Sequence, residues 1–183
     1  MNVIVAITGA SGAIYARQCL DILLGSDAVE RIALVVSRHG EDVLKAEGIA
    51  LPDDGRIERY ANDDMWSSLA SGSAAWDAMI VVPASMGSVG RIASGISQSL
   101  IERAADVMLK ERRRLVLVVR ETPYSLIHLR NMTAITEAGG VILPASPSFY
   151  IPADSIDSLA LSVSCRAVEM LGIMVSHPAW GDR

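Results

Sequence analysis

The sequence is poor in several residue types, and each shortage excludes a class of protein. Basic residues are outnumbered, 16 against 21 acidic ones, which gives a net charge of −5, so the positive surface expected of a nucleic-acid-binding protein is missing. Cys19 and Cys165 make neither a disulfide framework nor a metal motif, and His39, His128 and His177 form no cluster with them in the sequence. We therefore expect no metal site and a reducing, cytoplasmic environment.

Long apolar runs and targeting segments are absent as well. No uninterrupted apolar stretch reaches the ~18–20 residues of a membrane span, and the apolar N-terminus lacks a basic flank and meets Gly9 too early for a signal peptide. Hydrophobic residues make up 51 % of the 183 residues and charged residues 20 %, so a sizeable core is available. We expect one domain over residues 1–183, not in a membrane, with part of the apolar excess in subunit interfaces.

Five short apolar runs, each rich in Val and Ile, predict strands. None alternates polar with apolar side chains, which is typical of strands buried on both faces of a parallel sheet. The runs are residues 3–7, 32–36, 78–82, 115–119 and 141–143.

Helical patterns lie between these runs. Residues 16–23 carry an apolar stripe that Gly25 ends, and residues 97–111 and, more weakly, 128–138 predict two more helices. A last helix is expected from about Asp154, with Asp157 at capping-box spacing, to Gly172. An irregular tail follows from about residue 173.

The alternation of strands and helices predicts an α/β fold, a three-layer, doubly wound parallel sheet with right-handed crossovers. In such folds ligands bind beyond the carboxyl ends of the strands, where the strand order reverses. The segments that follow the predicted strands are therefore the places to look for a site: residues 9–12, 37–40, 83–90, 120–123 and 144–150.

Two of these segments have the composition of anion-binding turns. Residues 8–12, Thr-Gly-Ala-Ser-Gly, lead into a helix, whose N-terminus offers free N–H groups. The spacing is not that of a dinucleotide fingerprint, and the position favours phosphate binding over the alternative of a tight turn capped by Ser11. Residues 85–88, Ser-Met-Gly-Ser, offer hydroxyls at another helix start, although Ser and Gly are ordinary loop residues. Together the two turns suggest one phosphorylated ligand.

Charged side chains add further candidates. Arg103 and Lys110 are seven positions apart and share a helix face, where they either grip a phosphate or pair with acidic neighbours in solvent. Arg120 and Glu121 follow a buried strand directly, a costly place for charges that serve no site, and Glu121 is a candidate general acid or base. Spacing alone does not decide between function and structure for Tyr150 and Arg166.

Several longer segments resemble one known family. They are residues 100–113, continuing through 115–123 and 127–132, together with Gly-Ala-Ser-Gly-Ala-Ile-Tyr at 9–15 and Pro-Ala-Ser-Pro-Ser-Phe-Tyr at 144–150. They resemble the UbiX flavin prenyltransferases, formerly described as 3-polyprenyl-4-hydroxybenzoate or phenolic acid carboxy-lyases. The resemblance extends over essentially the whole chain and includes Trp180 in the tail.

This resemblance implies a Rossmann- or flavodoxin-like flavoprotein that acts on FMN. Members of the family bind reduced FMN and dimethylallyl monophosphate, join the prenyl group to flavin N5 and close a ring at C6, without a metal. The product serves UbiD-type decarboxylases, and the family assembles as homododecamers with sites between subunits. Whether this chain prefers the monophosphate or the diphosphate donor stays open at this point.

The resemblance also assigns roles to individual residues. The catalytic set would be Ser11 and Glu121, in proton transfer during ring closure, with Glu47 and Lys110 on the phosphate side. FMN would be contacted by Gly9, Ala10, Ser11, Ser37, Ser85, Met86, Gly87, Ser88 and Arg120. The dimethylallyl phosphate would be held by Arg103, Lys110, Tyr150 and Arg166, some of them from a neighbouring subunit, with Trp180 near the prenyl pocket.

The chain departs from the family pattern in its loops, and three competing functions stay open. Gly87 stands where many members carry a larger residue, often Lys, and Ala84 stands where many have Cys. A related group of FMN-dependent cysteine decarboxylases carries an Asn in this loop and a catalytic His; residues 83–87, Pro-Ala-Ser-Met-Gly, lack the Asn. A flavin carrier would hold its flavin without altering it, and a direct decarboxylase would turn over an aromatic acid without a partner protein.

Overall fold

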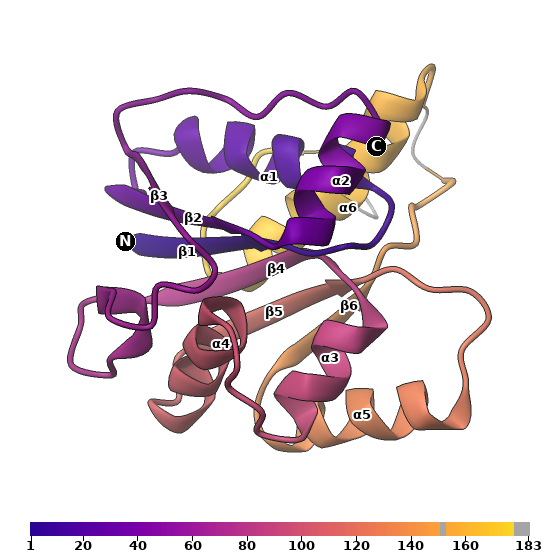
Figure 1. The fold of residues 1–183 in the computed structure, drawn as a ribbon. Helices are drawn as coiled ribbons and strands as arrows, with labels where there is room; N and C mark the ends of the chain where they lie inside the picture. The colour runs from indigo at the N-terminus through magenta and orange to yellow at the C-terminus, as the bar shows by residue number, and fades with distance from the viewer. Residues whose placement is uncertain (151–152, 178–183) are drawn as a thin grey trace.

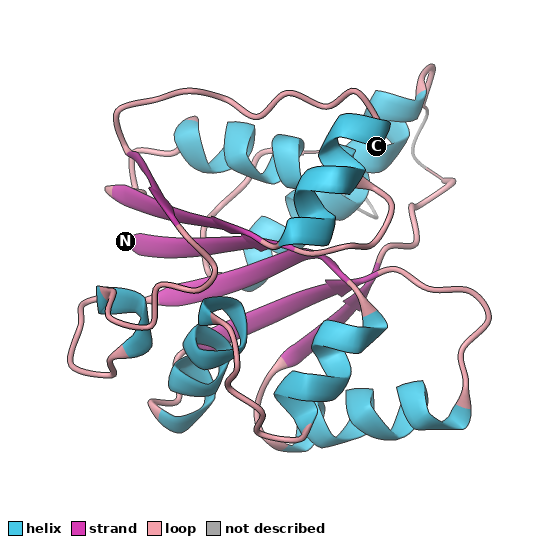
Figure 2. Ribbon diagram, in the orientation of Figure 1, coloured by secondary structure: helices cyan, strands magenta, loops and turns pink. Residues whose placement is uncertain are grey.

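The computed structural model describes residues 1–150 and 153–177. Within them a parallel sheet forms the centre of the molecule, with strand order β3-β2-β1-β4-β5-β6 (Figures 1 and 2). Its strands are β1 (Asn2–Ile7), β2 (Arg31–Val36), β3 (Ile57–Tyr60), β4 (Ala78–Ala84), β5 (Arg114–Val119) and β6 (Val141–Pro144). The order reverses between β1 and β4, which are neighbours although two strands separate them in the chain.

Helices cover both faces of this sheet, so the fold has three layers (Figure 1). One face carries α1 (Ala13–Leu24) and α6 (Ile156–Met170), which pack against each other. The other face carries the 3-10 helix η1 (Ser68–Ala70), α3 (Met86–Ala93), α4 (Leu100–Lys110) and α5 (Leu126–Glu137). The remaining helix, α2 (Arg38–Ala46), follows β2 and packs Leu44 into the core on the α1 side.

The strands supply alternate residues to the two cores because successive side chains point to opposite faces. In β1, Val3, Val5 and Ile7 pack under α1 and α6, whereas Ile4 and Ala6 pack under α3 and α4. Strand β4 is buried along its entire length. This burial on both faces explains why the strand runs are continuously apolar, and it confirms the predicted doubly wound parallel sheet.

One strand has no counterpart in the sequence pattern, and two predicted helix starts shift: α4 begins at Leu100, three residues after the predicted position, and α6 begins at Ile156. Strand β3, Ile-Glu-Arg-Tyr, is an edge strand with exposed charged residues, so it lacks the apolar run that marks the others. The last helix is capped by Ser155, not Asp154: Ser155 Oγ accepts a hydrogen bond from the Ser158 N–H at 3.1 Å. The capping box therefore lies one residue later than the Asp154–Asp157 pair predicts. Gly25 ends α1 as expected.

Candidate functional site

The carboxyl ends of β1 and β4 are joined by one buried side chain at the point where the strand order reverses. Thr8, which is 1 % exposed, donates from Oγ1 to the Pro83 carbonyl at 2.8 Å and accepts from the Ser85 N–H at 2.8 Å. Its own N–H reaches the same carbonyl at 3.2 Å. The turn after β1 and the turn after β4 are thereby held side by side, at the position where this class of fold binds ligands.

The turn after β1 is shaped by two glycines. A Cβ on Gly9 would lie 2.5 Å from the Cβ of His39 on α2, so a larger residue does not fit there. Gly12 has a φ of +106°, which favours glycine. Between them, Ala10 is buried and Ser11 is exposed. Close packing against α2 thus fixes the turn and presents the Ser11 hydroxyl to solvent.

The N-terminus of α1 is occupied by a carboxylate of the chain itself. Glu47, which follows α2, accepts hydrogen bonds from the Gly12 N–H at 2.9 Å and the Ala13 N–H at 2.7 Å. A negative charge at this end of a helix is favoured by the aligned peptide dipoles. The sequence predicts a bound anion at this helix start. In the structure the Glu47 carboxylate takes that position, on the N–H groups of the two residues that follow Ser11.

The turn after β4 also keeps free donors, and no carboxylate of the described residues occupies it. Ser85 caps α3 by accepting from the Ser88 N–H at 3.3 Å, and the Ser85 and Ser88 hydroxyl oxygens lie 3.1 Å apart. The N–H groups of Met86 and Gly87 make no hydrogen bond within the described part of the chain. This turn has the two hydroxyls and unpaired N–H groups that suit a phosphate.

Ser37 brings a third turn to the same edge of the sheet. It caps α2 by accepting from the Gly40 N–H at 3.1 Å, and its own N–H donates to the Ile7 carbonyl at 2.9 Å. The structure thus brings together, around the end of β1, the turns that carry the predicted FMN-contacting residues of 9–11, 37 and 85–88.

Arg120 lines a cavity of ≈ 280 Å³ at the same edge. Its Nε atom is buried and has no hydrogen-bond partner among the described residues, which is costly for a charged group. The walls come from the first turn of α1, the segment after β6 and the start of α6: Ser11, Gly12, Ile14, Tyr15, Ala145, Pro147, Ile156, Leu159 and Ala160. A buried guanidinium atom without a partner, in a cavity, is the signature of a ligand site.

Two neighbours of Arg120 bear on the chemistry. Glu121 is half-buried, and its Oε1 accepts from the Thr122 N–H at 2.9 Å. Burial raises the pKa of Tyr15 above its ordinary value of 10. The cavity therefore offers a hydroxyl from Ser11 and a phenol from Tyr15, with the carboxylate of Glu121 following Arg120 in the chain.

Arg103 and Lys110 are not brought to this cavity by their own chain. Lys110 ends α4 just before β5 begins, whereas Arg120 follows the end of β5, so six strand residues, or ~20 Å, separate them. Arg103 donates to the Ala70 carbonyl at 3.0 Å and pairs with Asp106 at 2.6 Å. Lys110 pairs with Glu111. Both residues belong to α4, which packs beside η1 (Figure 1).

Of the remaining predicted substrate residues, Arg166 lies on α6. Arg166 is ten residues beyond Ile156 of the cavity wall, ~15 Å along the helix, and pairs with Glu169 at 3.0 Å. Tyr150 follows β6 and is exposed. Trp180 lies outside the described residues.

Some residues of this site carried little signal in the sequence. Thr8 is a polar residue at the end of an apolar run, and nothing local distinguishes it from the turn that follows. Tyr15 lies in the first turn of α1, two residues after the helix begins, and Ser11 lies in the turn before it. Only the nearness of the two residues in the sequence indicates that both line one cavity.

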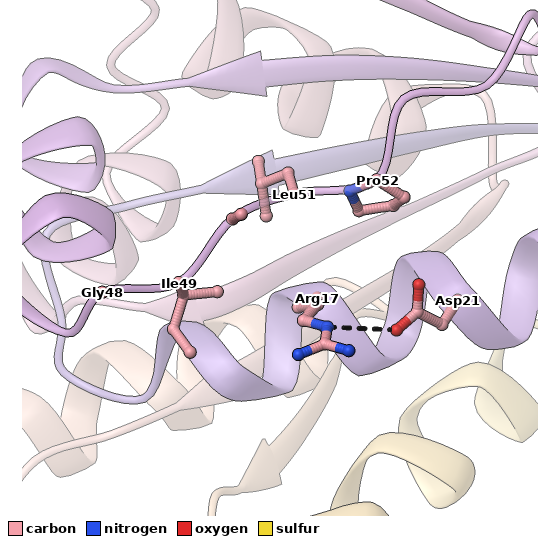
Figure 3. A pocket seen from close by; sticks show the side chains of 7 residues that line it. Arg17, Asp21, Gly48, Ile49, Leu51 and Pro52 are labelled. Carbon is pink, nitrogen blue, oxygen red and sulfur yellow. Dashed lines mark ion pairs between the residues drawn. The ribbon is translucent and has the colours of Figure 1, made fainter.

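A second hollow, of ≈ 440 Å³, has different chemistry (Figure 3). It lies between α1 and residues 48–52, and its charged side chains, Arg17 and Asp21, neutralise each other at 3.4 Å. None of the predicted site residues lines it. The cavity at Arg120 is therefore the better candidate for the active site.

Two features are absent from the described part of the chain. Residues 1–150 and 153–177 contain no group of three or more His, Cys, Asp or Glu side chains placed to hold a metal ion. None of the helices in these ranges is both long and apolar enough to cross a membrane.

Comparison with known proteins places the chain in a family. The family model described as "Flavoprotein" matches residues 1–161. The flavin prenyltransferase UbiX of Methanocaldococcus jannaschii is 40 % identical over 185 residues, which cover 99 % of each chain. A crystal structure of AnUbiX in complex with FMN and dimethylallyl pyrophosphate has a TM-score of 0.88 and 42 % identity, and covers 98 % of each chain.

A further solved structure covers the full length of both chains. It is a dodecameric FMN-dependent UbiX-like decarboxylase from Escherichia coli O157:H7, with a TM-score of 0.90 and 35 % identity over 100 % of each chain. Identity at this level along the entire sequence, together with the cavity at the strand-order reversal, leads to one assignment. The chain belongs to the flavoprotein family and, within it, to the UbiX flavin prenyltransferases.

Proposed function

We propose that the protein transfers a dimethylallyl group from dimethylallyl monophosphate to reduced FMN, first to N5 and then to C6. The observation that carries this proposal is the buried, unpartnered Nε of Arg120 in a cavity beside Ser11. Relatives at about 40 % identity are named flavin prenyltransferases, and one similar structure holds FMN together with a dimethylallyl donor.

The turns around β1 fit FMN. Gly9 packs against His39 of α2, which fixes the turn that carries Ala10 and Ser11, and Arg120 supplies an Nε donor that has no partner among the described residues. The turn of residues 85–88 supplies hydroxyls and free N–H groups for the phosphate. When bound in reduced form, the flavin supplies the nucleophilic N5 and C6 positions.

The chain's own residues then handle charge and protons. Breaking the allylic C–O bond releases a phosphate, and cations lower the barrier by stabilising the charge that develops on it. Arg103, Lys110 and Arg166 are the cations proposed for this role, with Tyr150 as a hydroxyl donor. Aromatic faces stabilise the developing allylic cation, the role proposed for Trp180. No metal is required for these steps.

Proton removal is proposed for Glu121 and Ser11. Glu121 follows Arg120 at the end of a buried strand, and Ser11 lines the cavity. A half-buried carboxylate near a hydroxyl can pass a proton from the ring to solvent during closure. Glu47, held on the Gly12 and Ala13 N–H groups, fixes the turn that carries Ser11.

A complete site needs a second copy of the chain. Lys110 lies ~20 Å from Arg120 in its own chain, at the far end of β5, and neither Arg103 nor Lys110 lines the cavity. If they grip the donor's phosphate, they reach the cavity of a neighbouring subunit. Apolar side chains exposed on α5, with Leu126 60 % and Ile127 67 % exposed, are consistent with subunit contacts. We propose a homododecamer, the assembly of one similar structure.

The proposed recipient of the product is a UbiD-type decarboxylase, and the proposed location is the cytoplasm. This part of the proposal follows from family membership. An acidic chain with few basic residues gives no reason to expect nucleic acid as a partner.

An anaerobic incubation with FMN, dithionite and dimethylallyl monophosphate tests the proposed activity. The flavin is extracted afterwards and weighed by mass spectrometry, and the expected result is a gain of one cyclised prenyl unit. A parallel incubation with the diphosphate decides between the two donors. Bound but unaltered FMN with either donor would contradict the proposal and favour a flavin carrier; release of CO₂ from an aromatic acid by the chain alone would favour a decarboxylase.

A further inference from the structure

The turn after β4 has a cation beside it. Arg91 lies four residues after Gly87 on α3, and long side chains of a helix lean back over the preceding turn. Arg91 Nη1 would lie 3.4 Å from a Cβ on Gly87, and Nη2 lies 3.4 Å from Ser88 Oγ. The guanidinium therefore covers the first turn of α3, in the space that a longer side chain at position 87 would fill.

A buried carboxylate holds this guanidinium in place. Glu102 Oε1 accepts from Arg91 Nε, and its side chain is only 5 % exposed. Its Oε2 accepts from the N–H groups of Gln98 and Ser99, each at 3.0 Å, at the N-terminus of α4. Two backbone N–H groups and the dipole of α4 thus share the charge of Glu102, and only the Nε atom of Arg91 contacts this carboxylate.

The donors left over gather around Gly87. Of the five guanidinium N–H bonds, that on Nε goes to Glu102 and one on Nη2 points to Ser88. Within residues 1–150 and 153–177, Nη1 makes no hydrogen bond, and the N–H groups of Met86 and Gly87 also lack partners. A rigid fork of N–H donors next to a helix N-terminus matches the oxygens of a phosphate group.

We propose that Arg91 is a phosphate-binding residue of the flavin site and that Glu102 is its positioning residue. This inference rests on the proposed function, because it requires FMN with its phosphate at the turn of residues 85–88. Arg91 acts on affinity for the phosphorylated flavin and takes no part in prenyl transfer. The flavin without its phosphate, riboflavin, gains nothing from Arg91.

The test compares FMN with riboflavin. Dissociation constants are measured by flavin fluorescence for the full-length wild type and for Arg91→Ala. The expected result is about ten- to one-hundred-fold weaker binding of FMN and unchanged binding of riboflavin. Arg91→Lys is expected to recover part of the loss, because it restores the charge without the fork. At saturating FMN, kcat for prenyl transfer stays within two-fold, so the loss appears in KM.

Two controls separate a ligand role from a structural one. Arg17→Ala removes a half-exposed arginine of another ion pair, with Asp21, and is expected to leave both affinities unchanged. Arg91→Met combined with Glu102→Gln removes the pair without leaving a buried charge, so it tests the role of Arg91 even if Arg91→Ala unfolds. This double variant is expected to lose FMN affinity selectively as well.

Equal weakening of FMN and riboflavin would overturn the inference, since it would show that Arg91 only supports the fold. Unchanged FMN affinity in Arg91→Ala and in the double variant would overturn it too. Failure of the proposed function looks different. In that case the wild type itself gives no prenylated flavin or does not prefer FMN to riboflavin, whatever the variants do.

Discussion

Thr8 Oγ1 lies 2.8 Å from the Ser85 N–H, and this hydrogen bond joins two turns that are 77 residues apart in the chain. The same oxygen donates to the Pro83 carbonyl at 2.8 Å, so the hydroxyl is used in both directions and is buried. The turn that carries Ser11 and the turn that carries Ser88 thereby have one fixed separation. A ligand that contacts both turns meets a preorganised site.

Thr8→Val is therefore expected to harm both stability and flavin binding. Valine keeps the shape but removes the hydroxyl that bonds the Ser85 N–H and the Pro83 carbonyl. A buried polar group left without a partner lowers the free energy of unfolding by about 1–3 kcal/mol. Urea unfolding and an FMN titration measure the two effects. Thr8→Ser keeps the hydroxyl and serves as the control, because it should retain most of the FMN affinity. Tight FMN binding by Thr8→Val would show that the bridge is dispensable.

Lys110→Ala is expected to reduce prenyl transfer by more than one hundred-fold, because it removes a cation proposed to stabilise the leaving phosphate. Little change in FMN affinity is expected, because Lys110 lies ~20 Å from Arg120 in its own chain. Arg120→Ala is expected to lose FMN binding instead. The two readouts, donor turnover and flavin titration, therefore separate the two halves of the site.

Mixing these two inactive variants tests whether the site is shared. After joint refolding or co-expression, random assortment places an intact Arg120 opposite an intact Lys110 in about one quarter of the sites. Prenyl-transfer activity should therefore return to about one quarter of the wild-type activity. No recovery in a mixed assembly, checked by mass spectrometry of the subunits, would show that both residues act within one chain or that Lys110 has no role.

Ile127→Glu tests the exposed apolar side of α5. Ile127 is 67 % exposed in the single chain, and burying a carboxylate in a subunit contact is unfavourable. Light scattering is expected to show a smaller assembly, and prenyl transfer should fall with it, because the cations of the neighbour are lost. Ala28→Glu, an exposed position before β2, is the control. A fully assembled but inactive Ile127→Glu would separate assembly from activity and contradict this reasoning.

The sheet could be predicted from the sequence because burial on both faces leaves a signal within each strand. Runs such as residues 78–82 are apolar throughout, and β4 is buried throughout. Strand β3 has exposed charges at its centre, so nothing local distinguishes it from a loop. Its pairing with β2 comes only from the tertiary structure.

The site was predictable in outline but not in its connections. Turns that follow buried strands must meet at one edge, which is why residues 9–12 and 85–88 could be grouped in advance. The contacts of Glu47 with Gly12 and of Glu102 with Arg91 link different elements, and no spacing rule announces them. The sequence around a glutamate near a helix does not reveal whether its carboxylate is solvated or pairs with a group on another element.

Glu169 provides a pH-dependent prediction. Burial raises the pKa of its carboxyl, but hydrogen bonds from Arg166 and His177, at 3.0 Å each, together outweigh it and hold the pKa below the ordinary value of 4.5. Because the pKa is lower in the folded state, ionised Glu169 stabilises the fold at pH above 4.5, and the contribution is lost as the pH falls through the folded-state pKa.

Glu169→Gln is therefore expected to lower the free energy of unfolding at pH 7 by up to about 1 kcal/mol, the range of partly exposed ion pairs. The stabilities of wild type and variant should converge in strong acid, where the wild-type carboxyl is also protonated. Urea unfolding between pH 3 and 7 measures both. Glu137→Gln, at the end of α5, removes a carboxylate with no side-chain partner among the described residues, so its profile should follow that of the wild type. A constant difference between Glu169→Gln and wild type at every pH would mean that Glu169 acts through packing and not through its charge.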